Sequence, residues 1–554
     1  MFGSLIARFG SVRGRLYSRC ILEFGAHALS AAFQQRLGRL VKADSGRCLQ
    51  GGFRGIEKES LRVTPDGYLS RAGHPAGLGS ALTNPFITTD FSEALLEFVT
   101  PAVGANWEAL RDLCDIHQFC YPHLGEELLW VTSMPCKIPP DDDIPLARYG
   151  NSNVGQMKNI YRRGLGYRYG RAMQTIAGLH FNYSLPGKFW ETWQELEGNR
   201  DSEQEFRSAA YLGLIRNFRR FGWLLLYLTG ASPALCKSFA QATPAGMPEL
   251  DEATFYQPFA TSLRMSDLGY SNKTQARLNI SLNRLEDYIA DLSSAICSPE
   301  PAYEKIGVKV DGKYRQLNSN HLQIENEYYS PIRPKRVAHS GERPTAALRR
   351  GGIEYVEVRS IDLNIFDPVG LNQNVMRFVE AFLIYCLLEE SPPLEEGDWD
   401  ELLQNHTQTA KQGRDPDFRL RRHGKLCSLR SWAAEIMPGV AAVAELLDAG
   451  SEQQDYRAAV NAQAELLDDP AATPSARLLN ELTRNSCSFF EFAMAAARGH
   501  RDYFSALTPL PAERLASYEA AVKDSLELQK SIEADDRIGF DEYLAAYYAS
   551  GPAG

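Results

Sequence analysis

The stretch GIEKESLRV, residues 55–63, alternates branched apolar residues with charged ones and predicts a β-strand. Glu57 and Glu59 lie two residues apart, so on a strand they point to the same face, about 6.6 Å apart along the chain. Similar strand-like stretches with polar groups on one face recur further along the chain.

Three more stretches have the same strand-like alternation, and each gathers polar groups on one face. They are LQIENEY (322–328), TIAGLHFNYSL (175–185) and IEYVEVRSIDL (353–363). The shared faces carry Glu325 with Glu327, His180 in the second stretch, and Glu357 with Arg359 in the third. Any one pair alone is typical of a solvated sheet face, but four such stretches together favour a converging site.

Converging carboxylates repel one another unless cations neutralise them. Oxygen ligands with one imidazole suit Mg²⁺ or Mn²⁺, and not a zinc ion bound by thiolates. The stretch ITTDFSEALLEFVTP (87–101) adds Asp90, Glu93 and Glu97. Asp90 and Glu93 have the spacing of a helix capping box, which leaves Glu93 with a structural alternative. Glu97 is flanked by apolar residues, where an unpaired carboxylate is costly, and so predicts a metal or a basic partner.

Basic residues lie next to these stretches, in IRPKR (332–336), in LRRGG (348–352) and at Arg264. Cations beside a metal site made of carboxylates are what phosphoryl transfer from a nucleotide requires. The sequence has no G-x-x-x-x-G-K-[ST] loop and no clear G-x-S-x-G elbow, which excludes a P-loop enzyme and disfavours a serine hydrolase. The residues alone predict a divalent-metal site that handles phosphate, without naming a substrate.

The whole chain has an ordinary globular composition, with 554 residues, 44% hydrophobic, and a net charge of −10. The acidic balance disfavours a nucleic-acid partner, and no apolar run is long enough for a membrane span. Helices are predicted over Phe206–Leu228, Ala441–Ala449, Tyr456–Asp468 and Leu515–Ala534. The fold class expected is α+β, with a mainly antiparallel sheet, a surface loop over Cys136–Pro145, and a boundary near Glu389–Asp400.

The N-terminal segment differs from the rest in charge. Residues 1–43 hold seven basic residues against one acidic residue, a net +6, so the remainder carries −16. This composition fits an organellar transit peptide, or an extension with no targeting role that is translated from a start codon placed too early. We expect the second. The ten cysteines are scattered without a CxxC pair and predict reduced, mostly buried thiols of an intracellular protein.

A series of motifs closely resembles the proteobacterial type (type 1) of glutamate–cysteine ligase, also called γ-glutamylcysteine synthetase. The matching stretches, in order, are GIEKESLRV, HPAGLGSALTNPFITTDFSEALLEFVTP, SMPC, YRRGLGYRYGRAMQTIAGLHFNYSLP, NFRRFGWLLLYLTGASPALC, ATSLRMSDLGYSNK, LQIENEYYSPIRPKR and LRRGGIEYVEVRSIDLN. They run from about residue 52 to 365. The C-terminal third matches in helical character only, and residues 1–30 have no counterpart.

The resemblance implies a funnel-like antiparallel sheet, as in glutamine synthetase, surrounded by helices. It implies the first step of glutathione synthesis: ATP as co-substrate joins the γ-carboxyl of L-glutamate to the amine of L-cysteine through γ-glutamyl phosphate. It divides the chain into an extension (1–45), a catalytic core (46–390) and a helical C-terminal part (391–554). It also implies a cytoplasmic enzyme, a monomer, with glutathione as a feedback inhibitor and no nucleic-acid or membrane partner.

The resemblance also assigns the site residues. Mg²⁺, or Mn²⁺, would be held by Glu57, Glu59, Asp90, Glu97, His180 and Glu357. The cysteine pocket would be formed by Phe91, Tyr161, Gln174, Tyr270 and Tyr329. Arg264 and Arg359 would meet glutamate and the transferred phosphate, as substrate-binding and catalytic residues. Arg333, Lys335 and Arg336 are candidates for ATP contacts by their position.

The sequence leaves two alternative functions open. One is a related carboxylate–amine ligase with another amine acceptor. The other is a catalytically silent protein that keeps the fold and binds metal or nucleotide. The intact set of acidic residues counts against the silent protein.

Overall fold

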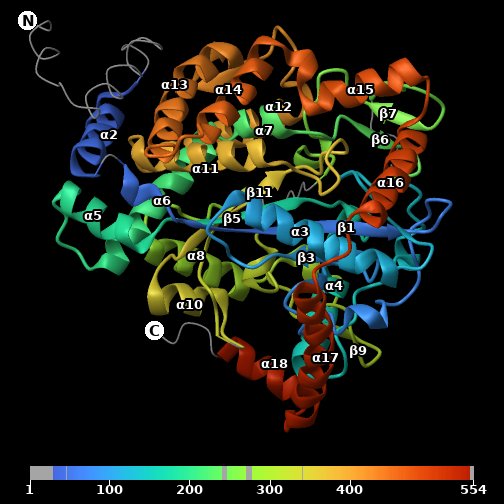
Figure 1. Cartoon of the computed structure of the whole chain (residues 1–554). Coiled ribbons are helices and arrows are strands. Elements are labelled where there is room, and N and C mark those ends of the chain that lie inside the picture. Colours follow the sequence, from blue (N-terminus) through green and yellow to red (C-terminus); the bar gives the residue numbers. More distant parts are fainter. Residues whose placement is uncertain (1–28, 45, 240–245, 270–277, 340, 550–554) are drawn as a thin grey trace, which may run out of the picture.

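A single antiparallel sheet forms the centre of the molecule (Figure 1). The computed structural model describes residues 29–44, 46–239, 246–269, 278–339 and 341–549. The strand order is β10-β11-β5-β1-β3-β2, with β4 paired to β1. The strands are β1 (Phe53–Val63), β2 (Ile87–Thr89), β3 (Leu95–Val99), β4 (Leu128–Leu129), β5 (Leu179–Ser184), β10 (Ile332–Lys335) and β11 (Tyr355–Ile361). This confirms the predicted α+β class and three of the four predicted strands.

One face of the sheet is apolar and packs against helices. Ile56 of β1 lies opposite Phe181 of β5, which lies opposite Val358 of β11, and all three are buried. Helix α3 (Asn106–Cys120) packs on β1 and β3, and α6 (Glu203–Phe221) packs on β10 and β11. Because side chains alternate along a strand, this packing leaves Glu57, Glu59 and Glu357 on the other face of the sheet.

A helical layer covers the sheet and includes most of the C-terminal third. Helix α11 (Gln373–Leu388), almost entirely buried, packs against α6, α13 (Leu429–Leu447) and α14 (Asp455–Asp468). The single helix predicted over 206–228 is in fact two, since α6 ends at Phe221 and α7 (Trp223–Thr229) begins after Gly222. Further helices are α4 (Asn153–Tyr169), α5 (Gly187–Glu197), α8 (Leu285–Cys297), α9 (Pro301–Glu304), α10 (Pro344–Gly351), α12 (Asp398–Gln412), α15 (Pro474–Asn485) and α16 (Phe489–Ala506). Three small hairpins complete the fold: β6 (Ala234–Cys236) with β7 (Thr254–Tyr256), β8 (Lys309–Val310) with β9 (Lys313–Tyr314), and β12 (Arg419–Arg422) with β13 (Lys425–Ser428).

Helix α2 (Ala31–Asp44) lies within the segment predicted to be an extension, yet it packs on the core. Phe33 and Leu40 are fully buried, and the Arg36 guanidinium donates hydrogen bonds to the carbonyls of Leu388 and Glu389 at the end of α11. The transit-peptide and mis-start interpretations rest on the charge of residues 1–43, of which residues 1–28 lie outside the described residues.

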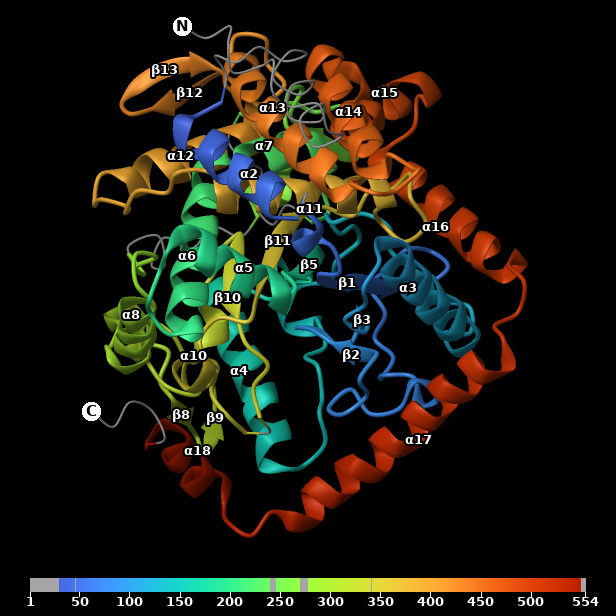
Figure 2. The same cartoon turned by 60° about the vertical axis from the view of Figure 1, so that its left-hand side comes forward.

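Two C-terminal helices, α17 (Ala512–Asp535) and α18 (Phe540–Ala549), form a strap along the outside of the molecule (Figure 2). Ser525 Oγ accepts a hydrogen bond from the Ser80 amide, and the Tyr548 hydroxyl donates to the Gln323 carbonyl at 2.9 Å. Leu544 packs in a small cluster with Met157 and Ile160 of α4. The strap therefore ties together segments that are hundreds of residues apart in the sequence.

Two expectations were wrong. The predicted strand 322–328 contains instead a 3₁₀ turn, η9 (Glu325–Glu327), in which Glu325 pairs with Arg343 and Glu327 pairs with Arg168. The expectation of reduced thiols fails at Cys136 and Cys236, which form a disulfide across 100 residues of sequence. Sequence spacing could not show this pairing. Among the described residues, no helix combines the length and apolarity needed to cross a bilayer.

Candidate active site

The strand register brings the acidic residues together on the face opposite the apolar row. Glu57 of β1 lies opposite His180 of β5, and Glu59 lies opposite Glu97 of β3. Glu357 of β11 lies opposite Asn182 of β5. Directly opposite residues on neighbouring strands project to the same side. The sheet thus carries one continuous acidic row across β3, β1, β5 and β11.

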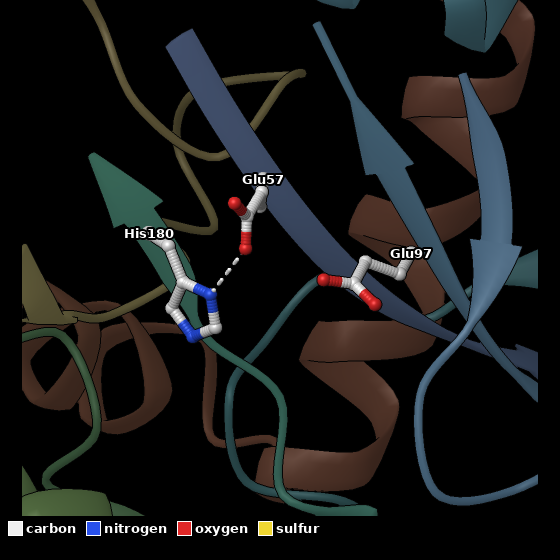
Figure 3. A group of neighbouring side chains, drawn as sticks. All are labelled: Glu57, Glu97 and His180. Carbon is white, nitrogen blue, oxygen red and sulfur yellow. Dashed lines mark hydrogen bonds and ion pairs between the residues drawn. The ribbon is translucent and has the colours of Figure 1, made fainter. Parts of the chain in front are cut away.

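Glu57, Glu97 and His180 form the tightest part of this row and point toward one another (Figure 3). One potential ligand atom from each lies within 4.8 Å of the others. His180 Nδ1 lies 2.9 Å from a Glu57 oxygen, and Asn182 Nδ2 donates to the other Glu57 oxygen at 2.9 Å. His180 Nε2 lies 3.7 Å from Glu59. Carboxylates with one imidazole are a donor set that fits Mg²⁺ or Mn²⁺.

The electrostatics of the row differ from one end to the other. Burial, reinforced by Glu57, Asp90 and Glu59, raises the pKa of Glu97 well above its ordinary value. At the other end burial opposes ionisation, but Lys335 and Arg359 hold the pKa of Glu357 well below its ordinary value. The Glu97 end is therefore short of positive charge, which a bound cation would supply.

Basic side chains surround the Glu357 end. Arg359 Nη1 lies 3.1 Å from one Glu357 oxygen, and Lys335 Nζ lies 3.0 Å from the other. Arg333 of β10 lies opposite Glu357 in the strand register, is buried, and donates to the carbonyl of Asn326 at 3.1 Å. Arg336, in contrast, donates to the carbonyl of Gly352 at the end of α10 and does not join this group. Of the three candidates for ATP contacts, Lys335 and Arg333 border the acidic row.

The family resemblance implies that Arg264 contacts substrate, and in the structure its guanidinium contacts other protein groups. Its side chain is buried, with Nη1 3.4 Å from Asp362 and Nη2 donating to the Arg359 carbonyl at 2.8 Å. In this structure Arg264 contacts the backbone that carries Arg359.

The expected cysteine-pocket residues come from several elements. Phe91 is buried next to Asp90, Tyr161 lies on α4, and Gln174 lies in the 3₁₀ turn η6 (Met173–Thr175). The Tyr329 hydroxyl lies 3.3 Å from Met265 Sδ, and Tyr329 borders a cavity of about 460 Å³ whose far wall is α12. Tyr270 lies outside the described residues.

Sequence reasoning missed two cations on α4. Lys158 and Arg162 are four residues apart, so they share one helix face, and both flank the Tyr149 ring. Burial, together with the Arg162 charge, lowers the pKa of Lys158 to about 8, while the nearby Glu97 opposes this shift. Their spacing was visible in the sequence, but nothing there placed α4 beside β3.

Glu93 does not take part in a capping box, because no helix begins there. Its carboxylate accepts hydrogen bonds from the backbone amides of His74 (3.0 Å) and Arg148 (2.8 Å). Glu93 thus links the loop that carries Asp90 to the segments at His74 and Arg148.

Comparison with known proteins gives one consistent result. The sequence model of the family described as glutamate–cysteine ligase matches residues 37–409. A glutamate–cysteine ligase of Alcanivorax borkumensis is 50% identical over 520 residues, which cover 93% of this chain and 99% of that protein. One from Pseudomonas putida is 48% identical, covering 91% of this chain and 95% of that protein. A crystal structure of glutamate–cysteine ligase from Francisella tularensis in complex with AMP superposes with a TM-score of 0.85 at 36% identity, covering 90% of this chain and 98% of that one.

Proposed function

The chain belongs to the glutamate–cysteine ligase family, and we propose that its acidic sheet face is the active site. The enzyme catalyses the ATP-dependent joining of the L-glutamate γ-carboxyl to the L-cysteine amine, the first step of glutathione synthesis. The observation that carries the site assignment is the row of Glu57, Glu97 and His180, continued by Glu357 and its two cations.

The acidic row fits a divalent cation by its chemistry. Three donor groups lie within 4.8 Å of one another, and burial together with the neighbouring carboxylates raises the pKa of Glu97. We assign Glu57, Glu59, Asp90, Glu97, His180 and Glu357 to hold Mg²⁺, with Mn²⁺ as a substitute. When bound, the cation neutralises phosphate charge and polarises phosphoryl oxygens.

The remaining residues act on the substrates. A carboxylate is a poor electrophile, so ATP first converts the glutamate γ-carboxylate to an acyl phosphate, whose phosphate is a good leaving group. Arg359 and Lys335 face the place where phosphate charge develops, and their fixed positions favour that charge. The cysteine amine then attacks the acyl carbon. Aromatic walls from Phe91, Tyr161 and Tyr329 exclude water that would hydrolyse this intermediate.

Several finer features belong to the proposal. ATP contacts are assigned to Lys335 and Arg333, which border the row. Glutathione acts as a feedback inhibitor, and the enzyme works as a monomer in the cytoplasm, where ATP is supplied. The competing function is a related ligase with another amine acceptor, which the same acidic row would serve equally well.

A phosphate-release assay tests the proposal. The enzyme is incubated with ATP, Mg²⁺ and glutamate, and the amine is varied among cysteine, 2-aminobutyrate, glycine and ammonia. We expect release with cysteine and its close aliphatic analogue. Equal release with ammonia would favour another acceptor, and none with any amine would contradict ligase activity. Glu357→Gln tests the site itself, and Glu354→Gln, three residues away in a surface ion pair with Arg336, is its control.

A further inference from the structure

Strand β11 contains an irregularity at Arg359, a residue assigned above to the active site. Its pairing with β5 shifts register between Val358 and Ile361, so Arg359 and Ser360 form a β-bulge. Bulges bend a strand and redirect the side chains that follow. Here the Arg359 amide still bonds to the Pro331 carbonyl at 2.8 Å. The Arg359 carbonyl accepts a hydrogen bond from a side chain, Nη2 of Arg264, also at 2.8 Å.

The Arg264 guanidinium is itself held by Asp362. Asp362 is buried, with 1% of its surface exposed, and its carboxylate lies 3.4 Å from Arg264 Nη1. The same carboxylate accepts hydrogen bonds from the Ala231 amide at 2.8 Å and the Ser262 hydroxyl at 2.9 Å. A buried carboxylate with three donors is fixed in place, so it can hold a guanidinium in one orientation.

A glycine makes room for this arrangement. A Cβ built on Gly178 would lie 2.0 Å from Arg264 Nη2, so no other residue fits there without moving the guanidinium. The Gly178 amide donates to Glu59 at 2.7 Å, which links the same point to the acidic row. Arg264 is therefore confined between the start of β5 and Asp362.

We infer that Asp362 is a positioning residue for the ligase reaction. Through Arg264 it holds the Arg359 carbonyl at the bulge, and so sets the direction in which the Arg359 guanidinium points. That guanidinium lies 3.1 Å from Glu357 and 3.4 Å from His180 Nδ1. The inference rests on the proposed role of Arg359 at the glutamate and phosphate site.

The test is a double-mutant cycle between Asp362→Asn and Arg359→Lys. Asp362→Asn keeps the size of the side chain but removes the charge that holds Arg264. We expect it to lower kcat/KM for glutamate roughly 10- to 100-fold, the scale of a misplaced catalytic group. KM for cysteine should change much less. In the Arg359→Lys background, Asp362→Asn should add only about twofold, because the group it positions is already lost.

Two further variants test whether the effect of Asp362→Asn is specific. Ser262→Ala removes one donor to Asp362 and leaves its charge, so it should produce a smaller loss in the same direction in a stably folded protein. Asp112→Asn is the matched control, since Asp112 is equally buried but pairs with Arg514 of the strap. We expect it to lower the melting temperature without changing the ratio of the two KM values.

The outcomes separate the two proposals. If Arg359→Lys is strongly impaired and Asp362→Asn is not, the inference about Asp362 fails and the active-site assignment stands. Losses that multiply in the double variant would also overturn it, because they indicate independent effects. If Arg359→Lys has no effect, both the assignment of Arg359 and the inference fail. If Asp362→Asn does not fold, an unaltered Ser262→Ala enzyme would count against the inference.

Discussion

Replacing Glu97 by glutamine should have opposite effects on activity and on the stability of the metal-free protein. Glu97 lies with Glu57 and His180 in a group whose ligand atoms fall within 4.8 Å of one another. Glutamine keeps the shape of the side chain but carries no charge and is a weaker ligand. The substitution therefore removes a cation ligand and, at the same time, a source of repulsion.

The magnitude follows from Coulomb's law. Two unit charges 4.8 Å apart repel by about 3.5 kcal/mol at an effective dielectric constant of 20. Burial of Glu97, together with this repulsion, raises its pKa well above the ordinary value, so protonation of Glu97 relieves both costs in the folded protein. Because this pKa is higher in the folded than in the unfolded state, the stabilisation is complete below the unfolded pKa. It is lost as pH rises through the folded pKa.

Thermal unfolding in EDTA, at about pH 6 and about pH 9, measures this effect. We expect the wild-type melting temperature to fall more than that of Glu97→Gln over this interval, so the variant is more stable by a few degrees at high pH. Added Mg²⁺ should raise the wild-type melting temperature and have little effect on the variant. Ligation should drop at least tenfold, as loss of a metal ligand removes transition-state stabilisation.

Glu93→Gln is the matched control, because Glu93 accepts two backbone hydrogen bonds on the same segment. It should lose stability at both pH values and keep its response to Mg²⁺. The reasoning is refuted if Glu97→Gln is less stable than wild type at high pH in EDTA, or if it retains more than about a tenth of the ligase rate.

Three further predictions concern stability. Glu327→Gln breaks the fully buried pair with Arg168 and should destabilise the protein by about 3–5 kcal/mol, measured by thermal or denaturant unfolding. Lys58 is buried 2.7 Å from His117, and burial lowers its pKa to about 7, so its charged form destabilises the fold as pH falls from alkaline values towards 7. Lys58→Met should remove this loss and raise the melting temperature near pH 6; an unchanged pH profile would contradict it. Cys136→Ser opens a disulfide that spans 100 residues and should lower stability by about 2–5 kcal/mol, with no further change on adding a reductant.

The central sheet and much of the acidic row were predictable because strand alternation is a local signal. Glu57, Glu59, His180 and Glu357 each fall on the expected face, and their register then follows from antiparallel pairing. The family resemblance supplied what alternation could not, namely the substrates and the role of Asp90.

The errors arose where long-range contacts override the local pattern. Glu325 and Glu327 share the alternation of the true strands, but each forms a buried ion pair, with Arg343 and Arg168 respectively, and the chain forms η9 there. The register shift at Arg359 was not visible in the sequence either, and neither was the hydrogen bond from Arg264, on another segment, to the Arg359 carbonyl. The family resemblance singled out Arg264 but did not indicate that its side chain contacts the backbone of Arg359.

The strap has a consequence for how the protein is made. In the order of synthesis α17 and α18 follow the other described elements, and their partners, such as Ser80 and Gln323, precede them by hundreds of residues. During translation these partner groups therefore lack their hydrogen-bonding atoms until the strap has been made. The contacts that tie the strap to the rest of the enzyme cannot form before α17 and α18 are synthesised.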